Sequence, residues 1–129
     1  NGALGEVTVI PAVRRQFRTE FIVFTGLGSF DQFSPGQLQT IGTNLARMLV
    51  DAWIEDIAMV PFGGGAGFGS DVILRNFLKG FFDGLTDADK DQTFRRLTIC
   101  ELDQGKYDQL VDEVLYNETG NEVLLIKRF

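Results

Sequence analysis

The feature that most constrains the fold is an alternation of strand-like and helix-like segments along the chain. Short apolar or alternating runs predict strands at residues 6–11, 20–25, 56–62, 95–102 and 122–129. Apolar residues at helical spacing predict helices in three of the intervening segments. The resulting order, β-β-α-β-α-β-α-β, predicts an α/β fold of three α/β/α layers around a mostly parallel sheet. The first two strands are close enough in sequence to form a hairpin, which would make the sheet mixed.

The ends of the predicted helices are marked by capping residues. Ser34 is expected to cap a helix over residues 35–53, and Gln37 is placed to complete a capping box with it. Gly84 is expected to stop the second helix, which leaves 86–92 as an acidic surface turn. Asp103 is expected to cap the third helix.

Composition narrows the classes of protein to which the chain can belong. Its 129 residues and 44% apolar content suit a single domain spanning 1–129. The chain has no histidine, which excludes a Ser-His-Asp triad, a Cys-His dyad and a histidine-ligated metal site built from this chain alone. The net charge of -6 opposes nucleic-acid binding, and no apolar run is long enough to span a membrane. We therefore expect neither nucleic acid nor membrane as a partner.

Features of the chain start and of the single cysteine bear on context. Cys100 lies in a strand-like apolar run, which predicts a buried core thiol and a reducing, cytoplasmic location. The chain starts at Asn1 without an initiator methionine or a signal-peptide pattern. We therefore expect a domain cut from a longer protein.

Two glycine-rich loops follow the second and third predicted strands, where ligands bind in open α/β sheets. The candidate ligand-binding residues are Gly26, Gly28, Gly65, Gly67, Phe68, Gly69, Ser70 and Asp71. Backbone N–H groups of segment 63–69 and of the helix start that follows could bind an anion. The same glycines could instead form a tight turn or pack against a neighbouring subunit. Ser70 or Asp71 is expected to cap the helix, and the Asp71 carboxylate opposes a phosphate there.

Other local patterns indicate surface structure rather than a site. No P-loop lysine follows the loop at 63–69, and Ser70 does not lie in a G-x-S-x-G motif. The aspartates at 87–91 resemble the start of a calcium loop, but its glycine and terminal glutamate positions hold other residues. We expect a solvated acidic turn there. The basic cluster of Arg14, Arg15 and Arg18 is expected at the surface or in an interface.

Several of these segments carry a resemblance to known proteins. Residues 23–28 (VFTGLG), followed by a polar loop and a long amphipathic helix, are similar to the amino-terminal domain of leucyl aminopeptidases, a macro-domain-like fold. Segment 62–70, with its Gly67-Phe68-Gly69 core, resembles the second phosphate loop of macro domains. The helix start at 34–38 (SPGQL), the glycine-rich turn with Ser70-Asp71 and residues 95–111 look like the aminopeptidase-like segments appended to bacterial caspase-like (CHAT) and conflict-system proteins. The resemblance implies a macro-like fold with a phosphate loop at 62–70 and a role in assembly and regulation. The asparagines of catalytic macro domains have no counterpart in residues 26–33.

The sequence thus predicts a non-catalytic binding or assembly and regulatory domain. Its expected partners are other domains of a parent chain or a second copy. The alternative is binding of a nucleotide or an ADP-ribose-type ligand at the Gly63–Gly69 loop, with a phosphate-containing small molecule as the partner. The pattern of residues identifies no cofactor and no complete catalytic constellation.

Overall fold

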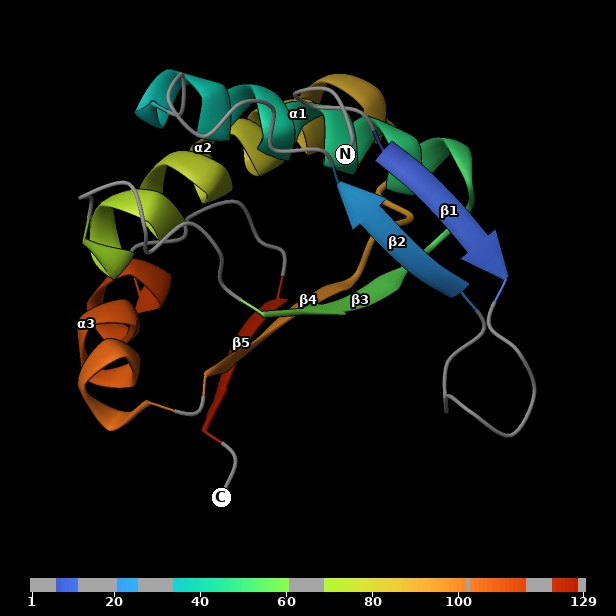
Figure 1. Cartoon of the computed structure of the whole chain (residues 1–129). Helices are drawn as coiled ribbons and strands as arrows, with labels where there is room; N and C mark the ends of the chain where they lie inside the picture. The colour runs from blue at the N-terminus through green and yellow to red at the C-terminus, as the bar shows by residue number, and fades with distance from the viewer. Residues whose placement is uncertain are drawn as a thin grey trace.

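The structure is a computed structural model that describes residues 7–11, 21–25, 34–60, 69–101, 103–115 and 122–127. Its five strands are β1 (Val7–Pro11), β2 (Phe21–Thr25), β3 (Asp56–Met59), β4 (Arg96–Glu101) and β5 (Glu122–Lys127). Its three helices are α1 (Pro35–Asp51), α2 (Ser70–Ala88) and α3 (Gln104–Leu115). Strands and helices follow one another in the predicted order, so the mixed α/β character of the chain is confirmed (Figure 1).

The described strands form two sheets rather than one. Strands β1 and β2 pair antiparallel as a hairpin, with Val7 opposite Thr25. Strands β3, β4 and β5 form a parallel sheet in that spatial order, with Asp56 opposite Arg96 and Arg96 opposite Glu122. The mostly parallel sheet predicted from the sequence therefore corresponds to the last three strands.

The helices pack over one face of the parallel sheet. Two successive right-handed crossovers that step in the same direction, β3 to β4 to β5, leave α2 and α3 on the same face. Burial agrees, because side chains from all three helices join those of β4 in one core. Its members include Ile41, Leu45 and Leu49 of α1, Leu74, Phe77 and Phe81 of α2, Leu97 and Ile99 of β4, and Leu110 of α3. The described residues thus make two layers where the sequence predicts three.

Helices α1 and α2 run parallel and touch through glycines. A Cβ atom on Gly80 would collide with the carbonyl oxygen of Gln39, and one on Gly42 with the carbonyl oxygen of Phe77. The Thr43 hydroxyl lies 3.0 Å from the carbonyl oxygens of both Gln39 and Gly80, so it can donate along its own helix or across to α2. The missing side chains let the two backbones approach closely enough for this contact.

The start of α1 differs from the predicted capping box. Ser34 is extended and its side chain makes no capping hydrogen bond. Its carbonyl oxygen instead accepts hydrogen bonds from the N–H groups of Gln37 and Leu38. The Oε1 atom of Gln37 is buried without a hydrogen-bond partner. The helix begins where the sequence predicts, but the capping box is wrong.

The end of α2 also differs from the prediction. Gly84 does not stop the helix, because it lies inside it and packs on α1, where a Cβ would sit 2.9 Å from the carbonyl oxygen of Thr43. The helix continues to Ala88, and Asp89 ends it. The Asp89 carboxylate accepts hydrogen bonds from the N–H and hydroxyl groups of Thr93 and from the N–H of Phe94, at 2.7–2.9 Å. These hydrogen bonds stabilise the turn that leads from α2 to β4.

Two further features complete the described fold. The Asp103 carboxylate accepts a 2.9 Å hydrogen bond from the Lys106 N–H, which confirms the predicted cap of α3. Cys100 is half-buried, so the predicted core thiol is wrong. Leu97 and Ile99 are buried on the helix side of β4, and Cys100 alternates with them and therefore lies on the other side of the strand. None of the described helices combines the length and the apolar character needed to cross a membrane.

Candidate functional site

The start of α2 holds the part of the predicted ligand site that the structure describes. Gly69 is the N-cap residue, with φ −69° and ψ 156°, and no side chain caps the helix. The Gly69 carbonyl oxygen accepts a 3.1 Å hydrogen bond from the N–H of Ile73. Ser70 is the first helical residue, so the prediction that Ser70 or Asp71 is the cap is wrong.

Asp71 puts a negative charge where an anionic ligand would bind. An ideal Cβ on Gly69 would lie 2.6 Å from its Oδ1 atom, so the carboxylate lies against the N-cap residue. Its Oδ2 atom is 3.8 Å from Nη2 of Arg75, one turn further along α2. A carboxylate in the first turn is stabilised by the helix dipole and competes with an external phosphate for the same position. A phosphate at this helix start would have to displace it toward Arg75.

The remaining predicted site residues, Gly26, Gly28, Gly65, Gly67 and Phe68, lie outside the described residues. The arginine cluster at 14–18 lies outside them too. The structure therefore brings together Gly69, Ser70 and Asp71 only, and the geometry of the two glycine-rich loops stays a prediction.

Two of the three aspartates that resemble a calcium loop, Asp87 and Asp89, have structural partners. Asp87 pairs with Arg47 of α1 at 3.0 Å, and both side chains are mostly exposed. Partial burial raises the pKa of Asp89, but its hydrogen bonds from Thr93 and Phe94 outweigh this and hold the pKa below the ordinary value. Across the part of the chain that the structure describes, no three acidic or cysteine side chains gather in a way that could hold a metal ion.

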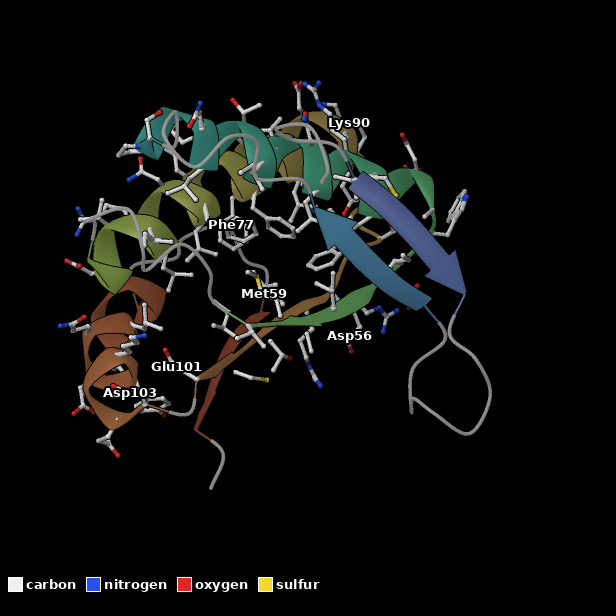
Figure 2. All side chains as sticks on the ribbon, in the orientation of Figure 1. Asp56, Met59, Phe77, Lys90, Glu101 and Asp103 are labelled. Atoms are coloured by element: carbon white, nitrogen blue, oxygen red, sulfur yellow. The ribbon has the colours of Figure 1, made fainter. Side chains whose placement is uncertain are left out.

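A surface that sequence reasoning missed lies on the parallel sheet, on the side away from the helices. Alternate residues of β3 and its end, Asp56, Ala58 and Val60, are exposed there. Figure 2 shows Met59 directed toward α2 and Asp56 directed away from it. On β4, Arg96 is exposed, and Thr98 and Cys100 are half-buried. We call these six residues the open face, because no described helix covers them.

The composition of β3 gives only a weak indication that one side of the strand is exposed. Residues 56–60 read Asp-Ile-Ala-Met-Val, in which the exposed positions carry one polar and two small or branched apolar side chains. That composition is typical of a strand buried on both sides. Val60 is nevertheless 69% exposed.

Comparison with known proteins adds no relative: no protein-family model, no curated protein and no solved structure matches the chain.

Proposed function

We propose that the chain is a non-catalytic binding and assembly domain, and that another protein surface covers its open face. The observation that carries the proposal is the one-sided helical cover of the parallel sheet. A sheet with apolar residues on both faces is stabilised by a layer on each side. The described part of the chain supplies one such layer, and an assembly partner would supply the third layer of the α/β/α arrangement.

The open face has the chemistry of a contact surface. Val60 and Ala58 are apolar and exposed, and Thr98 and Cys100 beside them are small and half-buried. Covering a valine stabilises an assembly by about 1.5–3 kcal/mol when the side chain becomes fully buried. Asp56 and Arg96 lie opposite each other at one end of this face, so polar groups border its apolar centre. An apolar centre with a polar rim is the usual anatomy of a protein interface.

The macro-like character of the domain is part of the same proposal. The resemblance of residues 23–28 and the loop and helix after them to amino-terminal domains of leucyl aminopeptidases supports an accessory role, because those domains are implicated in assembly and regulation. The described helix order and the parallel β3–β4–β5 sheet are compatible with such a fold.

A second candidate function is the binding of a nucleotide or an ADP-ribose-type ligand at the Gly63–Gly69 loop. It is favoured by the position of α2, whose uncapped N-terminus directly follows that loop. The Asp71 carboxylate at the same helix start argues against it.

A thermal-shift screen with ADP-ribose, ATP, NAD and inorganic phosphate separates the two functions. An assembly domain shows no stabilisation by any of them. A ligand present at ~100 times its Kd would raise the free energy of unfolding by ~2.7 kcal/mol. A shift that Gly67→Val abolishes and Asp71→Asn enlarges would refute the assembly proposal and make the chain a phosphate-ligand binder.

A further inference from the structure

The parallel sheet has one edge, on β3, to which none of the described strands is hydrogen-bonded. The N–H of Arg96 donates to the Glu55 carbonyl oxygen at 3.1 Å, so the backbone groups of Glu55 face β4. Backbone groups point to alternate sides along a strand, so those of Ile57 also face β4, whereas those of Asp56 and Ala58 face the outer edge. Both of these residues are exposed. Such an edge is a template for pairing with a further strand.

The position of α1 indicates which strand belongs at this edge. Helix α1 connects β2 to β3, and it lies on the same face of the sheet as α2 and α3, because it shares their core with β4. Crossovers between parallel strands are right-handed. With the helix on that face, a right-handed crossover always steps across the sheet in one direction, the direction from β3 to β4 to β5. The strand that precedes α1 therefore belongs one step before β3, which is the outer edge.

The β1–β2 hairpin already lies near this place. Val7 of β1 packs against the same core as Ile57 and Met59 of β3. Strand β1 also contacts α1, and Figure 1 shows the hairpin beside that helix. A hairpin of two strands alone is marginally stable at best. The apolar sequence of β2, Phe-Ile-Val-Phe-Thr, is typical of a strand buried within a parallel sheet.

We propose that β2 docks in parallel on the outer edge of β3, which joins the hairpin and the parallel sheet into one sheet of spatial order β1-β2-β3-β4-β5. The structure described above is the undocked state, in which the backbone groups of Asp56 and Ala58 are open to a strand from another molecule. Docking is a conformational switch that closes this edge. The switch is independent of the proposed assembly function, because it uses an edge of the sheet and not its open face.

The register of the docked strands follows from the faces of the two elements. Thr25 is opposite Val7 in the hairpin, and opposite residues of an antiparallel pair share a face. Because Val7 packs against the core, Thr25 belongs to the core side of the hairpin and the neighbouring position, Phe24, to the other side. Aligning Thr25 with Met59, the last core-side position of β3, places Phe24 beside Ala58 on the side of the open face.

The first experiment measures this neighbourhood by cross-linking. In a Cys100→Ser background, which removes the single native thiol, Phe24→Cys is combined with Ala58→Cys and treated with a short bis-thiol reagent. The matched control combines Thr8→Cys with Ala58→Cys. Thr8 is opposite Phe24 in the hairpin, so docking puts it on the same face but one strand, about 5 Å, further from β3. The Phe24 pair should cross-link within one chain, and the Thr8 pair should react much more slowly.

The second experiment needs no substitution. Hydrogen exchange of the unchanged protein compares the amides of Ala58 and Ile57, which are adjacent in β3 but face opposite edges. Docking should slow the exchange of Ala58 toward that of Ile57, because the Ala58 N–H then donates to β2. Exchange of Ala58 at the rate of an unprotected amide, with Ile57 protected, overturns the proposal. This result decides the matter even if the cysteine variants lose their helical circular dichroism.

The remaining outcomes of cross-linking are equally decisive. If the Thr8 pair reacts as fast as the Phe24 pair, β2 is not the strand beside β3. If the Phe24 pair links two chains at every concentration and never one chain to itself, another molecule fills the edge. Either result overturns docking within the chain. Neither bears on the assembly proposal, which the thermal-shift screen tests separately.

Discussion

Replacing Gly80 by alanine tests the close approach of α1 and α2 most directly. In an ordinary helix interior, glycine to alanine stabilises by ~1 kcal/mol. At Gly80 the added Cβ would collide with the backbone carbonyl of Gln39, which no rotamer change can relieve. The helices would have to separate, which would disturb the Thr43 hydroxyl that lies 3.0 Å from the Gly80 carbonyl and the 2.8 Å hydrogen bond between Gln39 and Asn76.

The magnitude follows from two opposing effects. Overpacking in a well-packed contact costs about 1–3 kcal/mol. The gain in helix propensity offsets ~1 kcal/mol of this. The net cost is therefore about 0–2 kcal/mol. Because the clash is with backbone, which cannot move aside as a side chain can, we expect the upper half of this range: Gly80→Ala should lower the free energy of unfolding by about 1–2 kcal/mol, measured by urea denaturation.

Gly36→Ala is the matched control for this substitution. Gly36 is also helical, in the first turn of α1, but an added Cβ would meet nothing within 4 Å. Only the propensity change applies, and we expect a stabilisation of up to about 1 kcal/mol. If Gly80→Ala stabilised the protein as much as Gly36→Ala does, the reasoning about the helix contact would be refuted.

Three further predictions concern single residues. Asp89→Asn should cost about 1–3 kcal/mol, because an amide cannot accept all the hydrogen bonds from Thr93 and Phe94. Since the pKa of Asp89 is lowered in the fold, its contribution to the free energy of unfolding is present above the unfolded pKa of about 3.8 and is lost as the pH falls through the folded pKa. Urea denaturation at several acidic pH values should therefore show a smaller loss of stability on acidification for Asp89→Asn than for the unchanged protein. Asp103→Ala should destabilise by ~1 kcal/mol through loss of the α3 cap, as seen by thermal denaturation. Because Trp53 has φ 59° and is 78% exposed, Trp53→Gly should stabilise the monomer by ~1 kcal/mol in dilute urea denaturation, and a destabilisation would show that the indole packs where the fold needs it.

The order of helices and strands could be predicted because the apolar residues of each segment recur at the spacing of a helix or of a strand. The apolar positions of α1, such as Ile41, Leu45 and Leu49, recur at helical spacing and are all buried. Three phenylalanines meet in the same core: Phe81 lies 5.7 Å from Phe77 and 5.4 Å from Phe94, measured between ring centroids. Helix start signals also located both α1 and α3 within one residue.

The features that the sequence predicts wrongly depend on contacts between segments that are distant in sequence. Gly84 has the identity of a helix stop, yet its lack of a side chain serves the contact with Thr43 on α1. Ser34 has the identity of a cap, but the structure satisfies the first N–H groups with its carbonyl instead. Neither the interior position of Gly84 nor the capping at Ser34 can be predicted from the local sequence pattern, because both depend on how α1 packs against its neighbours.

The candidate site also has one part that the local sequence pattern predicts and one part that depends on packing. The sequence located α2 immediately after the glycine-rich loop, since a buried strand pattern precedes that loop and an amphipathic pattern follows it. The open face was missed because exposure of Ala58 and Val60 depends on which side the helices cover. The sequence predicts Trp53 as the last residue of a helix, whereas in the structure Trp53 follows the C-cap residue Ala52 and has a positive φ, with the N–H groups of Trp53 and Ile54 making the capping bonds.

The alkylation rate of Cys100 is the most direct test of the central claim that the open face is covered in an assembly. Cys100 is the single cysteine of the chain and lies half-buried on that face. Where sedimentation shows that the chain self-associates, the account predicts that its rate constant for reaction with a neutral maleimide falls as protein concentration rises, and that Val60→Lys removes this protection. A rate constant that is the same at every concentration, in a sample shown by sedimentation to contain dimers, would contradict it.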